Sequence, residues 1–141
     1  MKVLLATDGS PDAIKAARFV AEVLGPGCRD LKVTLLYVKD PSPSVLPAEG
    51  TVSQEVIRSL DQEAAQVLAE AGQVLQRAGV EFRARSLWGD PASVIGLVAG
   101  EEKSDLVVVG SRGRHGLARL FLGSVSDKVV HRAPSSVLVV R

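Results

Sequence analysis

The 141-residue chain has an ordinary globular composition, with 46% hydrophobic and 23% charged residues, which excludes an intrinsically disordered chain. Its 17 basic and 16 acidic residues nearly cancel, and so small a net charge argues against nucleic acid as the main partner. A chain of this length buries roughly two thirds of its unfolded surface, so we expect one domain that spans residues 1–141.

Cysteine content and apolar runs indicate the compartment. Cys28 is the single cysteine of the sequence, which excludes an internal disulfide and suits a reducing environment. The apolar run from Val3 to Ala6 stops at Thr7, so the N-terminus lacks the pattern of a signal peptide. No run reaches the ~18 apolar residues that a membrane helix needs. We therefore expect a soluble, cytoplasmic protein.

The first half of the chain alternates between buried strands and a helix. Val3 to Ala6 and Val33 to Val38 are nearly continuous apolar runs, which favour strands buried on both faces. Between them, Ser10 to Asp12 has the pattern of an N-cap and a first helical turn. Gly25 to Gly27, with the sequence Gly-Pro-Gly, is expected to end that helix.

The second half continues the alternation after a connection rich in proline. Asp40 to Gly50 contains three prolines, and we expect a mobile connection there. A long helix is expected from Ser53 to about Ala78, followed by an edge strand at Glu81 to Trp88. The remaining expected elements are a helix that begins at Asp90-Pro91, a strand at Leu106 to Val109, a helix that stops before Pro134 and a strand at Val137 to Val140.

Strands that alternate with helices predict an α/β fold with a parallel sheet, helices on both faces and right-handed crossovers. We count five strands, which fit one sheet. In such a sheet a ligand binds beyond the carboxyl ends of the strands, at the point where the strand order reverses. The residues that follow each strand are therefore the first candidates for a site.

The stretch from Leu106 to Ser126 joins a strand, a glycine-rich loop and the start of a helix. Backbone N–H groups and the positive end of a helix dipole converge at such a junction, which favours a phosphate. We expect the glycines to adopt positive φ angles and to bring the backbone close to a ligand. Three arginines add positive charge, although arginines in a loop are also commonly solvated. The glycines are Gly110, Gly113, Gly116 and Gly123, and the arginines are Arg112, Arg114 and Arg119.

The spacing of these glycines excludes two common phosphate motifs. The loop lacks the Gly-Lys-Ser/Thr of Walker A, and two residues separate Gly110 from Gly113, unlike the dinucleotide motif G-x-G-x-x-G. The pattern Gly110-x2-Gly113-x9-Gly123-Ser124 resembles the ATP-binding motif of the universal stress protein family, G-x2-G-x9-G-S/T. The flanking segments VVVGSRG and GSVSDKVVHRAPSSVLVV are also similar to that family, and the resemblance covers nearly the whole chain.

The resemblance implies a three-layer Rossmann-like fold of the adenine nucleotide alpha hydrolase type, with strand order 3-2-1-4-5. Asp8 would then lie beside Gly110 at the reversal of the order. An aspartate next to Gly9 is a common turn residue, but a carboxylate at this place also suits ribose hydroxyls. Carried onto matching positions, the resemblance implies ATP-binding residues Ala6, Thr7, Asp8, Val38, Val109, Gly110, Arg112, Gly113, Gly123, Ser124, Val125 and Ser126. The phosphates of ATP would hold Mg²⁺ or Mn²⁺. Arg112 either neutralises phosphate charge or points to solvent.

The loop offers little for catalysis. A hydrolase needs a positioned base, and the loop supplies arginines, serines and His115 but no carboxylate. His131 is expected at a helix C-terminus, where the dipole favours it. The related PP-loop enzymes carry Ser-Gly-Gly-x-Asp-Ser after the first strand, where this chain has the different sequence Thr7 to Pro11. We expect an ATP-binding stress or signalling module with slow or no hydrolysis and no catalytic residue.

Two further expectations concern partners. Val137 to Val140 is apolar on both faces and would form an edge strand, which a second copy of the chain could cover. The resemblance likewise implies a homodimer through this strand. The alternative to an ATP-binding protein is a dimeric protein-interaction module of the same fold that binds no nucleotide.

Overall fold

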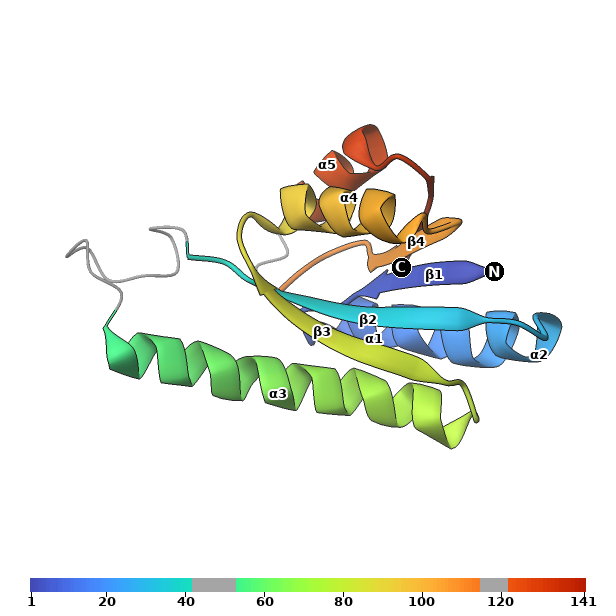
Figure 1. Ribbon diagram of the computed structural model, residues 1–141, viewed down its shortest axis with the longest axis horizontal. Helices are drawn as coiled ribbons and strands as arrows, with labels where there is room; N and C mark the ends of the chain where they lie inside the picture. Colours follow the sequence, from blue (N-terminus) through green and yellow to red (C-terminus); the bar gives the residue numbers. More distant parts are fainter. Residues whose placement is uncertain (42–52, 115–121) are drawn as a thin grey trace.

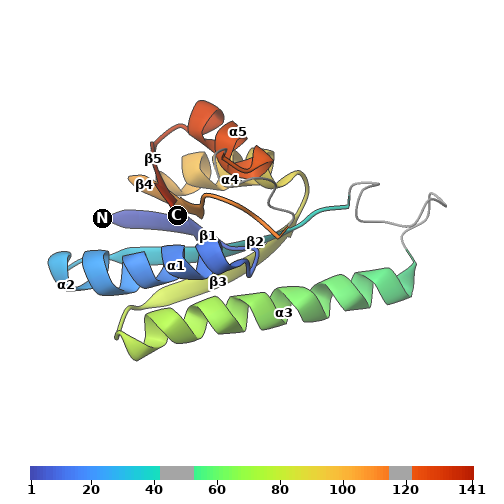
Figure 2. The ribbon, with the colours of Figure 1, turned by 180° about the vertical axis from the view of Figure 1, so that it is seen from behind.

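The computed structural model describes residues 1–41, 53–114 and 122–141. Five parallel strands form one sheet in the order β3-β2-β1-β4-β5. Helices cover both faces of the sheet, with α1 and α3 on one side and α4 and α5 on the other (Figure 1, Figure 2). The predicted fold class and strand order are confirmed.

The central strand β1 organises the sheet because it pairs with both β2 and β4. Its residue Leu5 lies in register with Leu35 of β2 and Val108 of β4, and all three side chains are fully buried. The five strands are β1 (Lys2–Ala6), β2 (Lys32–Lys39), β3 (Phe82–Trp88), β4 (Leu106–Gly110) and β5 (Ser136–Val140).

The first helical segment contains a π-helical turn that its sequence does not predict. Helix α1 (Pro11–Phe19) continues through a π-helical turn, η1 (Val20–Leu24), into the short α2 (Gly25–Gly27). The helix ends at Gly27, within the segment predicted to end it, and Gly25 to Gly27 form its last turn. After Gly27, Cys28 returns the backbone to an extended conformation.

The other helices are α3 (Gln54–Arg77), α4 (Pro91–Glu102) and α5 (Ser124–Arg132). Ser10, Ser53 and Asp90, where the sequence predicts helix starts, each accept a hydrogen bond from a backbone N–H in the first turn of the helix that follows. The proline-rich connection falls largely on residues 42–52, which lie outside the described residues. Among the described residues, no helix combines the length and hydropathy that crossing a membrane requires.

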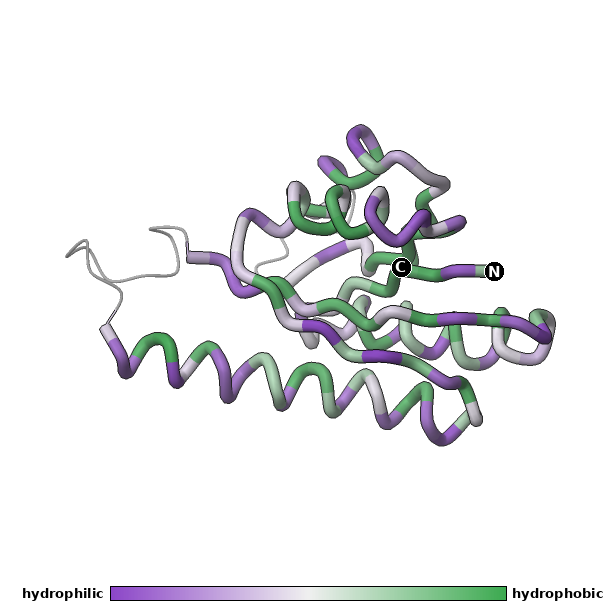
Figure 3. Tube along the Cα trace, in the orientation of Figure 1, coloured by the Kyte–Doolittle hydropathy of each residue, from purple (hydrophilic) through white to green (hydrophobic). Residues whose placement is uncertain are grey.

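Two hydrophobic clusters sandwich the sheet. Val3 and Leu5 of β1 face α1 and α3, whereas Leu4 and Ala6 face α4 and α5. Successive residues of a strand point to opposite faces, so a continuous apolar run fills both clusters. In Figure 3 the central strands are mostly green, the hydrophobic colour, whereas green and purple alternate along α3.

The two edges of the sheet differ in charge. On β3, Arg83 and Arg85 each place a nitrogen 2.6 Å from Glu102 Oε1, and the Thr34 hydroxyl donates to the same carboxylate at 2.7 Å. Burial opposes ionisation of Glu102, but hydrogen bonds from Thr34 and the two arginines lower its pKa. Strand β5 has only apolar, half-buried side chains from Val137 to Val140.

Candidate functional site

A cavity of about 600 Å³ opens at the carboxyl ends of β1, β2 and β4. Its wall also includes Leu60 and Glu63 of α3, Ile95 of α4 and the first turn of α5. This is the place where the strand order reverses, because the chain crosses from β1 to β2 on one side and reaches β4 on the other. The volume lies within the range of small-molecule sites.

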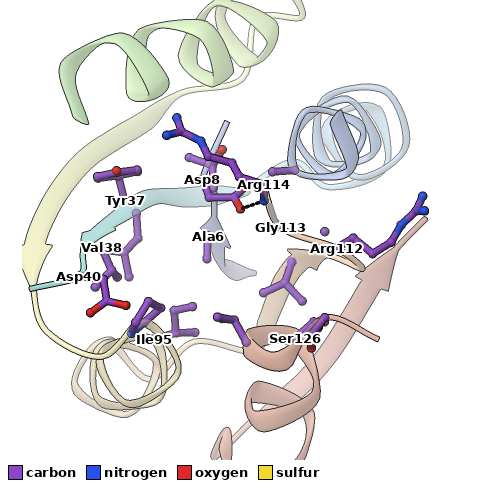
Figure 4. Close-up of a pocket in the computed structure, with 18 of the residues that line it drawn as sticks. Ala6, Asp8, Tyr37, Val38, Asp40, Ile95, Arg112, Gly113, Arg114 and Ser126 are labelled. Atoms are coloured by element: carbon purple, nitrogen blue, oxygen red, sulfur yellow. Dashed lines mark hydrogen bonds between the residues drawn. The ribbon is translucent and has the colours of Figure 1, made fainter. Parts of the chain in front are cut away.

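All twelve residues of the predicted site line this one cavity, and Figure 4 shows the central ones. The fold thus brings together Asp8 and Gly113, which lie far apart in the sequence. The side chain of Asp8 accepts a hydrogen bond from the backbone N–H of Arg114 at 3.2 Å across 106 positions. Their binding of a ligand stays a prediction.

A side chain at any of the three motif glycines would meet close contacts within the protein, and the contact with backbone is most severe at Gly110. A Cβ on Gly110 would lie 2.6 Å from the backbone nitrogen of Ala13. A Cβ on Gly113 would lie 2.7 Å from Asp8 Oδ2, and one on Gly123 would lie 3.2 Å from the carbonyl oxygen of Ser111.

The expectation of positive φ angles is wrong for these three glycines. The described glycines with positive φ are Gly9, Gly79 and Gly89, and Gly123 has a φ of −62° as the N-cap of α5. Lack of a side chain, rather than left-handed backbone, is what these loop positions need. Gly116, together with His115 and Arg119, lies outside the described residues.

Asp8 is a turn aspartate that also lines the cavity. Its Oδ1 accepts the N–H of Ser10 at 2.9 Å, as a turn aspartate does, while Oδ2 accepts the N–H of Arg114 at 3.2 Å. Both contacts hold the carboxylate at the rim of the cavity (Figure 4). The turn and the candidate site therefore use the same side chain.

Arg112 pairs with a carboxylate that the sequence analysis did not consider. Its Nε donates to Asp12 Oδ2 at 3.1 Å, and its side chain points away from the centre of the cavity (Figure 4). Ser111 Oγ donates to the same oxygen at 2.8 Å, and Lys15 Nζ lies 3.0 Å from the other oxygen. Burial opposes ionisation of Asp12, but these hydrogen bonds prevail and lower its pKa to about 2.

The start of α5 carries two predicted serines with different surroundings. Ser124 is exposed at the first position of the helix, and its N-cap Gly123 has no side-chain hydrogen bond to offer the first-turn N–H groups. Ser126 is buried, and its hydroxyl lies 2.9 Å from the carbonyl oxygens of both Ser111 and Gly123. Ser126 therefore holds the loop onto α5, whereas Ser124 faces outward beside the exposed Val125.

Sequence reasoning predicted Val38 of β2 but missed Tyr37 beside it and the face of α3 that lines the cavity. The buried Tyr37 donates its phenolic proton to Glu63 Oε1 at 2.9 Å, and Arg114 pairs with the same oxygen. Burial, together with this hydrogen bond to a carboxylate, raises the pKa of Tyr37 to about 12. The spacing of Leu60 and Glu63 puts them on one face of α3, but no local pattern shows that this face meets the cavity.

The remaining histidine and the potential metal ligands lie as follows. His131 lies exposed in the last turn of α5, as predicted, with Nδ1 2.8 Å from the carbonyl oxygen of Asp127. Within the described parts of the chain, no three His, Cys, Asp or Glu side chains gather in a way that could hold a metal ion. The His131 contact is local to its helix.

Known proteins of similar sequence match this chain along nearly its whole length. A universal stress protein of Thermus aquaticus is 41% identical over 141 residues, covering 99% of this chain and 97% of the relative. One from Methanocaldococcus jannaschii is 37% identical over 142 residues, covering 99% and 81%.

Solved structures share the fold over the same extent. A universal stress protein in complex with cAMP matches with a TM-score of 0.76 at 25% identity, covering 100% of this chain and 97% of the other. The universal stress protein from Archaeoglobus fulgidus in complex with dAMP matches with a TM-score of 0.72 at 25% identity, covering 100% and 98%. A model of the universal stress protein family matches residues 1–141. With this match over every residue, and with relatives of the same name and fold, the chain belongs to the universal stress protein family.

Proposed function

We propose that this protein binds an adenine nucleotide in the cavity, with ATP as the specific ligand, and serves as a cytoplasmic stress or signalling module. The observation that carries this proposal is the convergence of all twelve predicted residues on one cavity of about 600 Å³ at the carboxyl ends of the strands. Relatives of the same fold have been solved with cAMP and dAMP, which supports the adenine nucleotide class.

The chemistry of the cavity wall fits the parts of a nucleotide. Val38 and Ile95 provide apolar surface suited to a base, and Asp8 provides a carboxylate suited to ribose hydroxyls (Figure 4). The first turn of α5, at Gly123 and Ser124, provides uncapped N–H groups and the positive end of a helix dipole for phosphates. A Mg²⁺ or Mn²⁺ ion would enter with these phosphates and neutralise part of their charge.

We infer slow or no hydrolysis from the surroundings of the carboxylates. A general base must be placed to accept a proton from the attacking water. Asp8 already accepts two backbone N–H groups, and Glu63 accepts from Tyr37 and Arg114. Both carboxylates are therefore already engaged within the protein, and neither is held in position to accept a proton from an attacking water. Bound nucleotide then acts as a signal or a stabiliser rather than as a substrate.

Calorimetric titration with Mg-ATP, AMP and GTP tests the proposal. We expect micromolar binding of ATP, about −8 kcal/mol. Gly113→Ala places a Cβ 2.7 Å from Asp8 Oδ2, so the carboxylate must move, and we expect at least a roughly tenfold loss of affinity. Gly27→Ala is the matched control, because its Cβ meets no atom within 4 Å.

Two outcomes of this titration would contradict the proposal. Folded wild-type protein that binds none of the nucleotides would favour the alternative, a protein-interaction module of the same fold. Equal ATP affinity of Gly113→Ala and Gly27→Ala would show that the cavity is not the nucleotide site. Turnover at ~10 per second, the median for enzymes, would replace the signalling proposal with an ATPase.

We also propose a homodimer through β5. Edge strands expose unpaired N–H and C=O groups, and charged side chains are one way in which proteins protect them. Strand β3 has this protection from Arg83 and Arg85, whereas Val137 to Val140 of β5 are apolar and only half buried. Pairing β5 with the same strand of a second copy would cover this edge by two-fold symmetry.

A further inference from the structure

We infer that Arg114 is the arginine of this cavity that contacts the phosphate charge of a bound ligand, exchanging Glu63 for a phosphate as its partner. The inference rests on the proposed function for the ligand class, but it assigns a role to two residues that the glycine motif does not include. Both residues line the cavity, Glu63 from α3 and Arg114 from the loop that follows β4.

The backbone of Arg114 is anchored while its side chain can move. Its N–H donates to Asp8 Oδ2 at 3.2 Å, which fixes the residue at the rim of the cavity. Its guanidinium pairs with Glu63 and lies over Gly9, with Nη2 3.3 Å from where a Cβ on that glycine would be. The side chain is 42% exposed, so rotation about its own bonds can change its partner without moving the loop.

Arg112 is less suited to this role, although it stands closer to the centre of the motif. Its partner Asp12 has a side chain only 4% exposed, and its pKa of about 2 keeps it ionised at every physiological pH. Drawing Arg112 away would remove one of the groups that stabilise a buried carboxylate, which is costly. In Figure 4 the side chain of Arg112 points away from the cavity, whereas Arg114 lies beside Asp8.

Glu63 can release Arg114 at small cost. Its Oε1 also accepts the phenolic proton of Tyr37 at 2.9 Å, and its side chain is 33% exposed. After the exchange, the carboxylate would keep this hydrogen bond and would be hydrated on its open side. A buried carboxylate with no second hydrogen-bond donor could not release its arginine cheaply, because it would be left unpaired and without water.

The exchange makes the site sensitive to ligand charge. Glu63 repels any phosphate that approaches Arg114, so a ligand must compete with one carboxylate charge. A triphosphate supplies more negative charge and more acceptor oxygens than a monophosphate, and hydrogen bonds between ionised groups are the stronger kind. We therefore expect Arg114 and Glu63 to set the preference for highly charged ligands, while leaving recognition of the nucleoside to other parts of the wall.

Titration of ATP, adenosine and inorganic tripolyphosphate into wild type and three variants tests this assignment. Arg114→Gln should weaken ATP and tripolyphosphate about tenfold, the loss expected for one charge-assisted hydrogen bond in a half-exposed place, and change adenosine by less than about twofold. Glu63→Gln should strengthen both anions by roughly threefold, because glutamine still accepts from Tyr37 but neither holds nor repels charge. Arg77→Gln, at the exposed far end of α3, is the control for net charge and should change none of the three affinities.

The results separate this inference from the proposed function. ATP binding that is equal in wild type and Arg114→Gln overturns the inference and leaves the proposed function intact. Equal losses for adenosine and ATP in Arg114→Gln, or weaker ATP binding in Glu63→Gln, also overturn it, because the residues would then act through the shape of the site. If the protein binds tripolyphosphate but neither ATP nor adenosine, the proposed function is refuted. The change in tripolyphosphate affinity on Arg114→Gln then tests the role of Arg114 by itself. If the wild-type protein binds neither ATP nor tripolyphosphate, both the inference and the proposed function are refuted. Thermal melts check that each variant is folded.

Discussion

Replacing Gly110 with alanine tests whether the first glycine of the motif serves packing within the protein. The new Cβ would lie 2.6 Å from the nitrogen of Ala13, 2.7 Å from the carbonyl carbon of Asp12 and 3.0 Å from its oxygen. Favourable contacts between heavy atoms lie near ~3.5 Å or beyond, so the overlap is about 1 Å. All three atoms belong to the backbone of the first turn of α1, which cannot rotate away as a side chain would.

The cost follows from what has to move. The Ser10 hydroxyl caps this turn at the nitrogen of Ala13, and the side chain of Asp12 holds Ser111. The end of β4 and the start of α1 must therefore separate against several hydrogen bonds. Overpacking costs typically 1–3 kcal/mol, and we expect about 3 kcal/mol here. For a domain of this size that lowers the melting temperature by roughly 10 °C.

Urea unfolding and thermal melts, both followed by circular dichroism, measure this loss against Gly27→Ala. The control makes the same chemical change at a position where no atom lies within 4 Å of the new Cβ, so we expect its free energy of unfolding to change little. If Gly110→Ala matches the control to within about 0.5 kcal/mol, the packing argument is wrong. A variant of normal stability that has lost ATP affinity would instead show that Gly110 is glycine because of the ligand.

Two other predictions concern charge and assembly. Asp12 has a pKa lowered from 3.8 to about 2, so the stability it contributes is complete above pH 3.8 and is lost as the pH falls toward 2. The difference in free energy of unfolding between wild type and Asp12→Asn should therefore be constant near neutral pH and shrink across this range; a constant difference down to pH 2 would show that Asp12 is not held ionised. Val139→Lys puts a charge on the edge strand β5, and light scattering should then show a monomer where the wild type is a dimer. A wild type that is already monomeric at working concentration, or a Val139→Lys dimer as stable as the wild type, would refute pairing through β5.

Elements and their order could be predicted because they depend on local patterns. The apolar runs at Val3 to Ala6 and Val33 to Val38 indicated buried strands, and Ser10, Ser53 and Asp90 marked the helix starts that the structure has. Gly25 to Gly27 contains the end of the first helix, as predicted, but the π-helical turn from Val20 to Leu24 that precedes it was not predicted.

The residues predicted for the site line one cavity, but the contacts among them were not predicted. The spacing of Gly110, Gly113 and Gly123, with the family resemblance, identified residues that do line one cavity. These glycines were expected to adopt positive φ angles, but none of the three does. They lie instead against backbone and carboxylate atoms of the protein. Spacing alone does not reveal the neighbour that a glycine must accommodate.

The sequence by itself determined the strands, the caps and the glycine loop, because hydrophobic periodicity and turn chemistry act over a few neighbouring residues. Only the tertiary structure decided which charges meet. Arg112 pairs with Asp12 across 100 positions, and Arg114 pairs with Glu63 across 51. Such pairs depend on the angle at which α1 and α3 pack on the sheet and on which face of α3 turns toward the loop. These are properties of the packed layers, and no local segment contains them.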